Sequence, residues 1–234
     1  MNTEQTNLVH LFPQFYIQKK FGEHDTYKDA IFNKSFSDEN LEDLPTLQKH
    51  DLAPFNTYPC VTEEDENLDL DVFPSFMQDL EAEIALMMIQ CNIQASASVT
   101  NIWYNIYGQG DSHERHTHIG HPVQLSGVYF YDNIRTDEFA LWNPCIKLLE
   151  GSGYNHPIWR ESDLNFAHDI AIPVVEEGTI LLFPPYLEHA VRPIKNDLDK
   201  KRITFAFNLA FKPETQTPPA PPEENQIQSV VRLS

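Results

Sequence analysis

The pattern of hydrophobic and polar positions changes near residue 98 from helical spacing to the pattern of strands. Before that point, residues 75–91 carry apolar side chains three or four positions apart, which predicts one amphipathic helix. The apolar positions of this segment are Phe76, Leu80, Ile84, Met87, Met88 and Cys91. Pro74 and the acidic residues that follow it favour a helix N-terminus here. We therefore expect a single helix that supports the rest of the fold.

Beyond Val99 the pattern is typical of β-structure, because short runs of β-branched and aromatic residues alternate with turn residues. The predicted strands are residues 101–107, 124–131, 139–142, 167–175, 179–183 and 203–211. Residues 15–19 are a further candidate for an edge strand. Short strands without helices between them favour an antiparallel barrel or a double-sheet jelly roll. The expected fold class is thus mainly β with some α: a jelly roll with a supporting N-terminal helix.

This pattern divides the chain into three parts. Residues 1–98 are an N-terminal extension, residues 99–212 are the β-rich core, and residues 213–234 are a proline-rich tail that we expect to be flexible. Within the extension, residues 38–71 hold eleven acidic residues and one lysine. We expect this acidic segment to be a solvated connection with little regular structure.

Composition then narrows the function classes. The 234 residues include 35 acidic and 16 basic side chains, which gives a formal net charge of −19. A chain of this charge repels nucleic-acid backbones and anionic membranes, so we expect neither as a partner. The eight glycines form no phosphate-binding loop motif, which argues against a nucleotide cofactor.

Three cysteines, Cys60, Cys91 and Cys145, lie far apart and form no paired motif. They support neither a zinc ribbon nor a disulfide framework, and they fit a reducing cytoplasm. The N-terminal residues have no basic region followed by an apolar stretch, so we expect no signal peptide. No apolar run approaches the roughly 20 residues that a membrane span needs. The expected location is cytoplasmic.

Histidine is the residue type that indicates chemistry. Four of the ten histidines fall within nine residues: His113, His116, His118 and His121. On a strand or at a strand exit, the spacing of His116 and His118 puts both imidazoles on one face, where they can share a metal. His113 and His121 are interpreted as loop or cavity-mouth residues.

A third candidate ligand, His189, follows the predicted strand 179–183. The usual non-haem iron triad is two histidines and one carboxylate, with open positions for other ligands. Two alternatives therefore stand: either His118 is a ligand in a three-histidine site, or a carboxylate such as Asp132 or Glu138 completes the triad.

Four segments together resemble the 2-oxoglutarate- and Fe(II)-dependent oxygenases of phages and marine bacteria, which are related to prolyl 4-hydroxylases. The segments are NIWYNIYGQG (101–110), HTHxxxxxxLSGVYFY (116–131), PVVEEGTILLFPPYLEHAVRP (173–193) and RITFAFN (202–208). The resemblance implies a double-stranded β-helix, Fe(II) as cofactor and 2-oxoglutarate as co-substrate. It also implies that His116, His118 and His189 hold the metal. His118 departs from the standard oxygenase motif, which has Asp or Glu at this position, but the resembling family also includes members with histidine here.

The resemblance further implies a site for the co-substrate. Arg202 would anchor the far carboxylate of 2-oxoglutarate, because a guanidinium matches the geometry of a carboxylate. Thr204 shares a face with Arg202 and would add a hydroxyl hydrogen bond. Asn105, Tyr107 and Ser126 are further candidates to line this site.

Three function classes follow from these observations. The first is an Fe(II)- and 2-oxoglutarate-dependent oxygenase that hydroxylates a small molecule or peptide and releases succinate and CO2. The second is a cupin-like three-histidine dioxygenase that does not use 2-oxoglutarate. The third is a non-catalytic jelly-roll binding module. The acidic surface favours neutral or cationic substrates.

Overall fold

The computed structural model describes most of the chain around the β-rich core. The described residues are 14–32, 68–93, 95–119, 123–132, 138–145, 168–194 and 202–212, together with the backbone of 56–59. The predicted tail at 213–234, His121 and most of the acidic segment lie outside the described residues.

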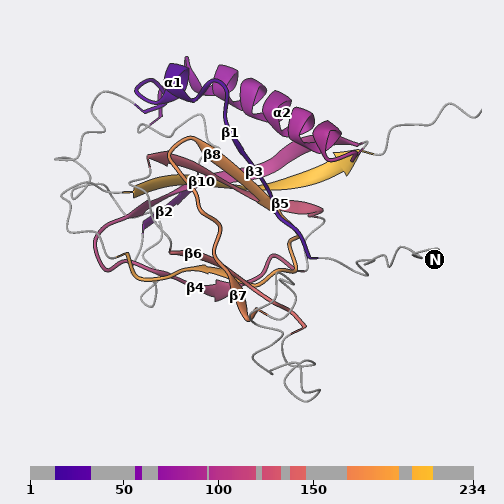
Figure 1. Ribbon diagram of the computed structural model, residues 1–234. Coiled ribbons are helices and arrows are strands. Elements are labelled where there is room, and N and C mark those ends of the chain that lie inside the picture. The colour runs from indigo at the N-terminus through magenta and orange to yellow at the C-terminus, as the bar shows by residue number, and fades with distance from the viewer. Residues whose placement is uncertain are drawn as a thin grey trace, which may run out of the picture.

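Two antiparallel sheets face each other, and two helices cover the outer face of the larger sheet (Figure 1). The larger sheet has the order β1 (Ile17–Lys20), β8 (Thr179–Phe183), β5 (Leu125–Asp132), β10 (Arg202–Lys212), β3 (Ser96–Tyr107), β2 (Asn56–Pro59). The smaller sheet has the order β4 (His113–His116), β9 (His189–Val191), β6 (Phe139–Trp142), β7 (Ile170–Ala171). The helices are α1 (His24–Tyr27) and α2 (Phe73–Gln90). This architecture confirms the predicted β-rich jelly roll with a supporting helix.

The alternation along the central strand β10 explains why the larger sheet is buried on both faces. Ile203, Phe205 and Phe207 point toward the helices and belong to one apolar core. Arg202 and Thr204 point the other way, into the space between the sheets. Because successive side chains of a strand alternate between faces, one strand supplies both the core that supports the helices and the polar residues of the interior.

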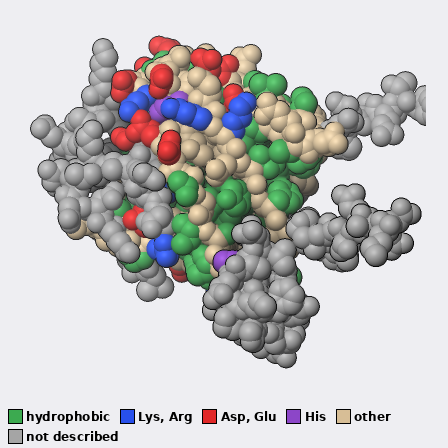
Figure 2. Space-filling view, in the orientation of Figure 1, with side chains coloured by type: hydrophobic (Ala, Val, Ile, Leu, Met, Phe, Trp, Pro, Cys, Tyr) green, Lys and Arg blue, Asp and Glu red, His purple; other side chains and the backbone are tan. Residues whose placement is uncertain are grey.

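Helix α2 carries the predicted apolar stripe. Phe76, Leu80 and Ile84 are fully buried against the larger sheet, so the prediction of an amphipathic helix is confirmed. The helix begins two residues earlier than predicted, and its proline lies in the first turn, where the missing N–H costs no hydrogen bond. Charged side chains gather over this helical layer in Figure 2. In the described part of the chain, neither helix combines the length and apolar character needed to cross a bilayer.

Several strands differ from the sequence predictions. The strand predicted at 167–175 is reduced to the two residues of β7, because only these two pair with β6. The segments β4 and β9 were not predicted as strands and pair with each other. Residues 56–59 lie within the acidic segment for which we expected little regular structure, yet they form β2 and pair with β3. This expectation was therefore wrong for those four residues.

The close approach of β5 and β10 gives a prediction about stability. Gly127 pairs with Phe207, and a Cβ added to this glycine would lie 2.2 Å from the buried ring. Gly127→Ala should therefore lower the free energy of unfolding by about 1–3 kcal/mol, the usual cost of overpacking a core. Chemical denaturation measures the change, and Gly22→Ala is the matched control because its Cβ would meet only a flexible Glu83 side chain. A Gly127→Ala variant as stable as the wild type would contradict the packing described here.

Candidate metal centre

A single cavity between the two sheets collects most of the residues predicted to carry the chemistry. Its polar lining includes histidines from β4, β9 and the segment after β4, and residues of β3 and β10. The predicted site residues that line it are Asn105, Tyr107, His116, His118, His189, Arg202 and Thr204. Apolar walls come from Val128, Phe139 and Phe183.

Three imidazoles meet at one end of this cavity. His116 lies at the end of β4, His189 begins β9, and the two residues pair in the antiparallel ladder. The ring centroids of His116 and His189 are 4.2 Å apart, and that of His118 lies 5.3 Å and 5.1 Å from the other two. One ligand atom from each histidine lies within 4.8 Å of the others, a spacing that fits a shared metal ion.

The strand argument for His118 was only partly right. Strand β4 ends at His116, so strand alternation does not extend to His118. The backbone N–H of His118 instead donates to the Pro185 carbonyl at 2.9 Å, which ties the segment after β4 to the turn before β9. This cross-connection, rather than strand periodicity, brings the second imidazole to the site.

Each imidazole has an oxygen beside its Nδ1 atom. Nδ1 of His116 lies 2.8 Å from the backbone carbonyl of Glu114, and Nδ1 of His189 lies 3.0 Å from that of Leu187. Because a carbonyl only accepts, each Nδ1 carries the proton and donates it. This leaves the Nε2 lone pairs free to bind a metal, as metal-ligating histidines require.

Burial lowers the pKa of two histidines of the cavity, His189 and His113. Desolvation lowers the pKa of His189 to about 3, and the neighbouring His116 adds to this effect, whereas the hydrogen bond to Leu187 opposes it. Desolvation also lowers the pKa of His113 to about 3, with His116 again contributing. The His113 ring stacks on His116 with centroids 4.4 Å apart, but His113 is not among the three residues whose ligand atoms converge.

These lowered pKa values predict how stability depends on pH in metal-free protein. In the unfolded chain a histidine takes up a proton as the pH falls through about 6.5, whereas the folded protein keeps His189 and His113 neutral to about pH 3. The unfolded state therefore binds more protons in this window, and stability should fall as the pH is lowered from 7 to 4. With a chelator present, the melting temperature should fall less between pH 7 and pH 4 in His113→Asn than in the wild type. An equal fall of the melting temperature with pH in the two proteins would contradict the burial of a neutral His113.

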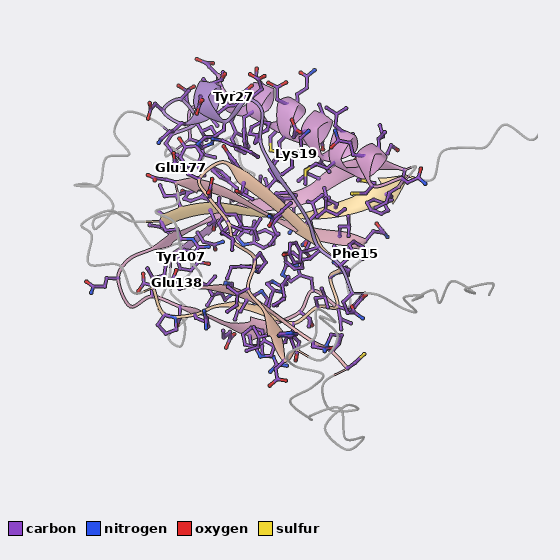
Figure 3. The ribbon with its side chains drawn as sticks, in the orientation of Figure 1. Phe15, Lys19, Tyr27, Tyr107, Glu138 and Glu177 are labelled. Atoms are coloured by element: carbon purple, nitrogen blue, oxygen red, sulfur yellow. The ribbon has the colours of Figure 1, made fainter. Side chains whose placement is uncertain are left out.

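A second polar group of the cavity lining lies at the start of β10. Arg202 is 1% exposed, and its Nη1 atom lies 4.0 Å from the Glu138 carboxylate, which is also buried. The guanidinium lies against the rings of Tyr107 and Phe130, at 5.5 Å and 5.0 Å from their centroids. Desolvation lowers the pKa of Arg202, and Tyr107 and Glu138 oppose this shift. Tyr107 and Glu138 appear next to each other between the sheets in Figure 3.

The two carboxylates considered as alternative metal ligands lie elsewhere. Glu138 faces Arg202, and the charge of Asp132 acts on Lys28, which follows α1. Among the described residues, the group with converging ligand atoms consists of the three histidines. The described geometry therefore supports a three-histidine site.

One predicted cavity residue has a different position. Ser126 does not line the cavity: its hydroxyl lies 2.7 Å from Nδ1 of His118, behind the imidazole. Asn208 lies at the same nitrogen, at 2.8 Å, and was not singled out from the sequence. The available signals for Asn208 were its place at the end of the segment RITFAFN and its alternation with Arg202 and Thr204 on one face of β10.

Comparison with known proteins bears on this geometry. Residues 101–208 match the model of the family described as "Putative 2OG-Fe(II) oxygenase". The predicted resemblance to 2OG-Fe(II) oxygenases is confirmed. The matched segment runs from β3 to the Asn208 position of β10 and includes all three converging histidines. No curated protein matches the chain.

Solved structures of 2OG oxygenases share the fold. A prolyl 4-hydroxylase from Pseudomonas putida is 10% identical, with a TM-score of 0.50 over 85% of this chain and 94% of that chain. The α-ketoglutarate-dependent epimerase SnoN from nogalamycin biosynthesis is 10% identical, with a TM-score of 0.51 over 84% of this chain and 77% of that chain. A 2OG-Fe(II) oxygenase family protein from Burkholderia pseudomallei is 10% identical, with a TM-score of 0.44, and the chain spans 65% of its length and matches over 67% of its own. The two structures with TM-scores of 0.50 and 0.51 support the double-stranded β-helix fold.

Proposed function

We propose that the protein is a non-haem Fe(II)- and 2-oxoglutarate-dependent oxygenase that hydroxylates a small molecule or peptide. The observation that carries this proposal is one cavity that is lined both by three converging imidazoles and by a buried guanidinium. The family match over 101–208 supports it. In the proposed reaction, one oxygen atom of O2 enters a substrate C–H bond and the other enters succinate, while 2-oxoglutarate loses CO2.

The three histidines fit Fe(II) as ligands. His116, His118 and His189 offer imidazoles whose ligand atoms lie within 4.8 Å of one another, and imidazole suits iron. When bound, Fe(II) supplies the activation of O2 in this reaction class. Three protein ligands leave further coordination positions for other molecules. The two backbone carbonyls behind His116 and His189 hold these rings in place before any ligand arrives.

The buried end of the cavity fits a dicarboxylic acid. Arg202 supplies a positive charge in a dry environment, where a charge-assisted hydrogen bond to a carboxylate is strong. Thr204 lies two positions along β10 on the same face, and Tyr107 and Asn105 on β3 complete this wall. We assign the far carboxylate of 2-oxoglutarate to Arg202 and Thr204, with its 2-oxo acid end toward the histidines.

The apolar side chains that line the cavity have a separate function. Val128, Phe139 and Phe183 line the cavity and are almost entirely buried. Such walls exclude bulk water from the reacting atoms and lower the local dielectric constant. They therefore favour oxidation of the bound substrate over side reactions with solvent.

The surface next to the histidines favours an uncharged substrate. Ile119 directly follows His118 and is 68% exposed, and the exposed Tyr186 follows Pro185, which accepts the backbone hydrogen bond of His118. The Tyr186 hydroxyl contacts the side chain of Gln14, next to the exposed Phe15 that Figure 3 labels. Exposed apolar side chains at the edge of a cavity mark binding surfaces. We therefore favour a neutral peptide or small molecule with an apolar part.

A second function class has one observation in its favour. The group of converging ligand atoms contains no carboxylate, as a cupin-like three-histidine dioxygenase would require, and Arg202 already faces Glu138. Such an enzyme would bind the metal but would not consume 2-oxoglutarate.

The proposal is tested by assaying 2-oxoglutarate turnover. Purified protein is loaded anaerobically with Fe(II), mixed with 2-oxoglutarate in aerated buffer, and assayed for succinate with and without candidate peptides. We expect slow uncoupled succinate formation that requires both Fe(II) and O2. Metal binding without any succinate formation would favour the three-histidine dioxygenase, and no metal binding would favour a binding module.

A further inference from the structure

We propose that Ser126 and Asn208 are positioning residues that fix the ring and the tautomer of His118. The inference rests on the proposed metal site and adds the residues that support its third histidine. Neither residue touches the cavity itself.

The two residues form a pair on neighbouring strands. Asn208 of β10 lies directly opposite Ser126 of β5 in the antiparallel ladder. The side chains of both are buried, Ser126 completely and Asn208 at 7% exposure. The Ser126 hydroxyl lies 3.1 Å from Oδ1 of Asn208, and both oxygens lie within 2.8 Å of Nδ1 of His118. The three side chains therefore form one closed hydrogen-bonded group.

The donors and acceptors of this group specify the tautomer. Oδ1 of Asn208 only accepts hydrogen bonds, so Nδ1–H of His118 donates to it. The Ser126 hydroxyl donates to the same oxygen and keeps the amide turned toward the imidazole. The proton therefore stays on Nδ1, and the lone pair of Nε2 faces His116 and His189.

His118 needs this support more than the other two histidines do. His116 and His189 lie on strands and donate to carbonyls of their own backbone neighbourhood, Glu114 and Leu187. His118 lies beyond the end of β4, and the acceptor at its Nδ1 is a side chain. A substitution at Asn208 can therefore remove the hydrogen bond that supports His118 alone. Partners of this kind usually contribute 10–100-fold to metal affinity.

The first measurement is the tautomer itself in metal-free protein. Long-range 1H–15N spectra of protein labelled at histidine nitrogens distinguish the Nδ1–H from the Nε2–H form of each neutral ring. We expect the Nδ1–H form for His118 in the wild type and its loss in Asn208→Leu. An Nε2–H form in the wild type would overturn the inference, and this readout requires neither a variant nor activity.

The second measurement is the affinity for Co(II), followed by its visible absorption. We expect Asn208→Leu to weaken binding by about 10–100-fold, and Asn208→Asp to restore it because a carboxylate also accepts from Nδ1–H. Asn101→Leu is the matched control, since Asn101 lies opposite Asn208 on β3 and is exposed. Binding within twofold of wild type in Asn208→Leu would overturn the inference.

Two further tests cover the cases in which Asn208→Leu does not fold or the protein binds no metal. Ser126→Ala removes the hydroxyl with minimal change in volume, so a folded variant remains if Asn208→Leu fails to fold; we expect the Nδ1–H signal of His118 to weaken in it. An unchanged tautomer and unchanged Co(II) affinity in folded Ser126→Ala would remove Ser126 from the pair. If wild-type protein binds no metal, the proposed function fails, and the tautomer measurement still decides this inference.

Discussion

Replacing His189 with alanine should abolish high-affinity binding of Fe(II), and with it any turnover of 2-oxoglutarate. His189 is 5% exposed and supplies the only converging imidazole from β9 among the described residues. Loss of groups that merely support a ligand usually costs 10–100-fold in metal affinity, so loss of the ligand should cost more than about 100-fold. The measurement is a metal titration of chelator-treated protein.

Two controls separate loss of the ligand from loss of the fold. His168→Ala changes an exposed histidine outside the cavity and should bind metal like the wild type. His116→Ala removes a ligand that is only half-buried, so its effect on packing is smaller. Both ligand variants should keep a cooperative thermal transition. Metal affinity within a few-fold of wild type in both variants would exclude the three-histidine site.

Replacing Arg202 with methionine should weaken the binding of 2-oxoglutarate and leave the binding of metal nearly unchanged. Removing one partner of a buried, hydrogen-bonded charge pair costs about 2–5 kcal/mol, at least about 30-fold in affinity. Because Arg202 is not among the residues whose ligand atoms converge, the affinity for Co(II) should stay within about threefold of wild type, well below the cost of losing a ligand contact. The measurements are the 2-oxoglutarate concentration at half-maximal succinate formation and the metal titration.

The control for this variant addresses Glu138. Arg202→Met leaves the buried Glu138 carboxylate without its neighbouring cation, which can destabilise the fold. The double variant Arg202→Met with Glu138→Gln removes both charges and should regain stability but not 2-oxoglutarate affinity. Unchanged dependence on 2-oxoglutarate in either folded variant would exclude Arg202 as the anchor and favour an enzyme that does not use this co-substrate.

Strand periodicity predicted the polar wall of the cavity well. The two-residue spacing of Arg202 and Thr204, and of Asn105 and Tyr107, placed each pair on one face, and both pairs line the cavity. This works because β10 and β3 are long and adjacent, and their pairing stays in register from Arg202 to Asn208.

The same reasoning failed where the strands end. His118 lies beyond β4, and its position depends on contacts with Pro185 and Asn208, which are far away in the sequence. Ser126 was expected in the cavity because it alternates with Val128, but the imidazole of His118 lies against its hydroxyl. Long-range contacts of this kind leave no periodic signal in a single sequence.

Predictions that rested on residue charge alone were also incomplete. Glu138 was a possible metal ligand by residue type, yet it lies beside Arg202. The strand at 56–59 lies in a segment whose acidic composition indicated a solvated connection, but four residues without acidic side chains are enough to pair with β3. Composition averaged over a segment hides such short elements.

The most direct test of the central claim is an anaerobic titration of Fe(II)-loaded protein with 2-oxoglutarate, followed by visible absorption. A 2-oxo acid that chelates Fe(II) gives a metal-to-ligand charge-transfer band, which reports binding before any substrate is known. We predict a saturable band in the wild type, its loss in His189→Ala, and a shift to higher 2-oxoglutarate concentration in Arg202→Met. An Fe(II)-loaded wild-type protein that shows no band at any 2-oxoglutarate concentration would contradict the proposed function.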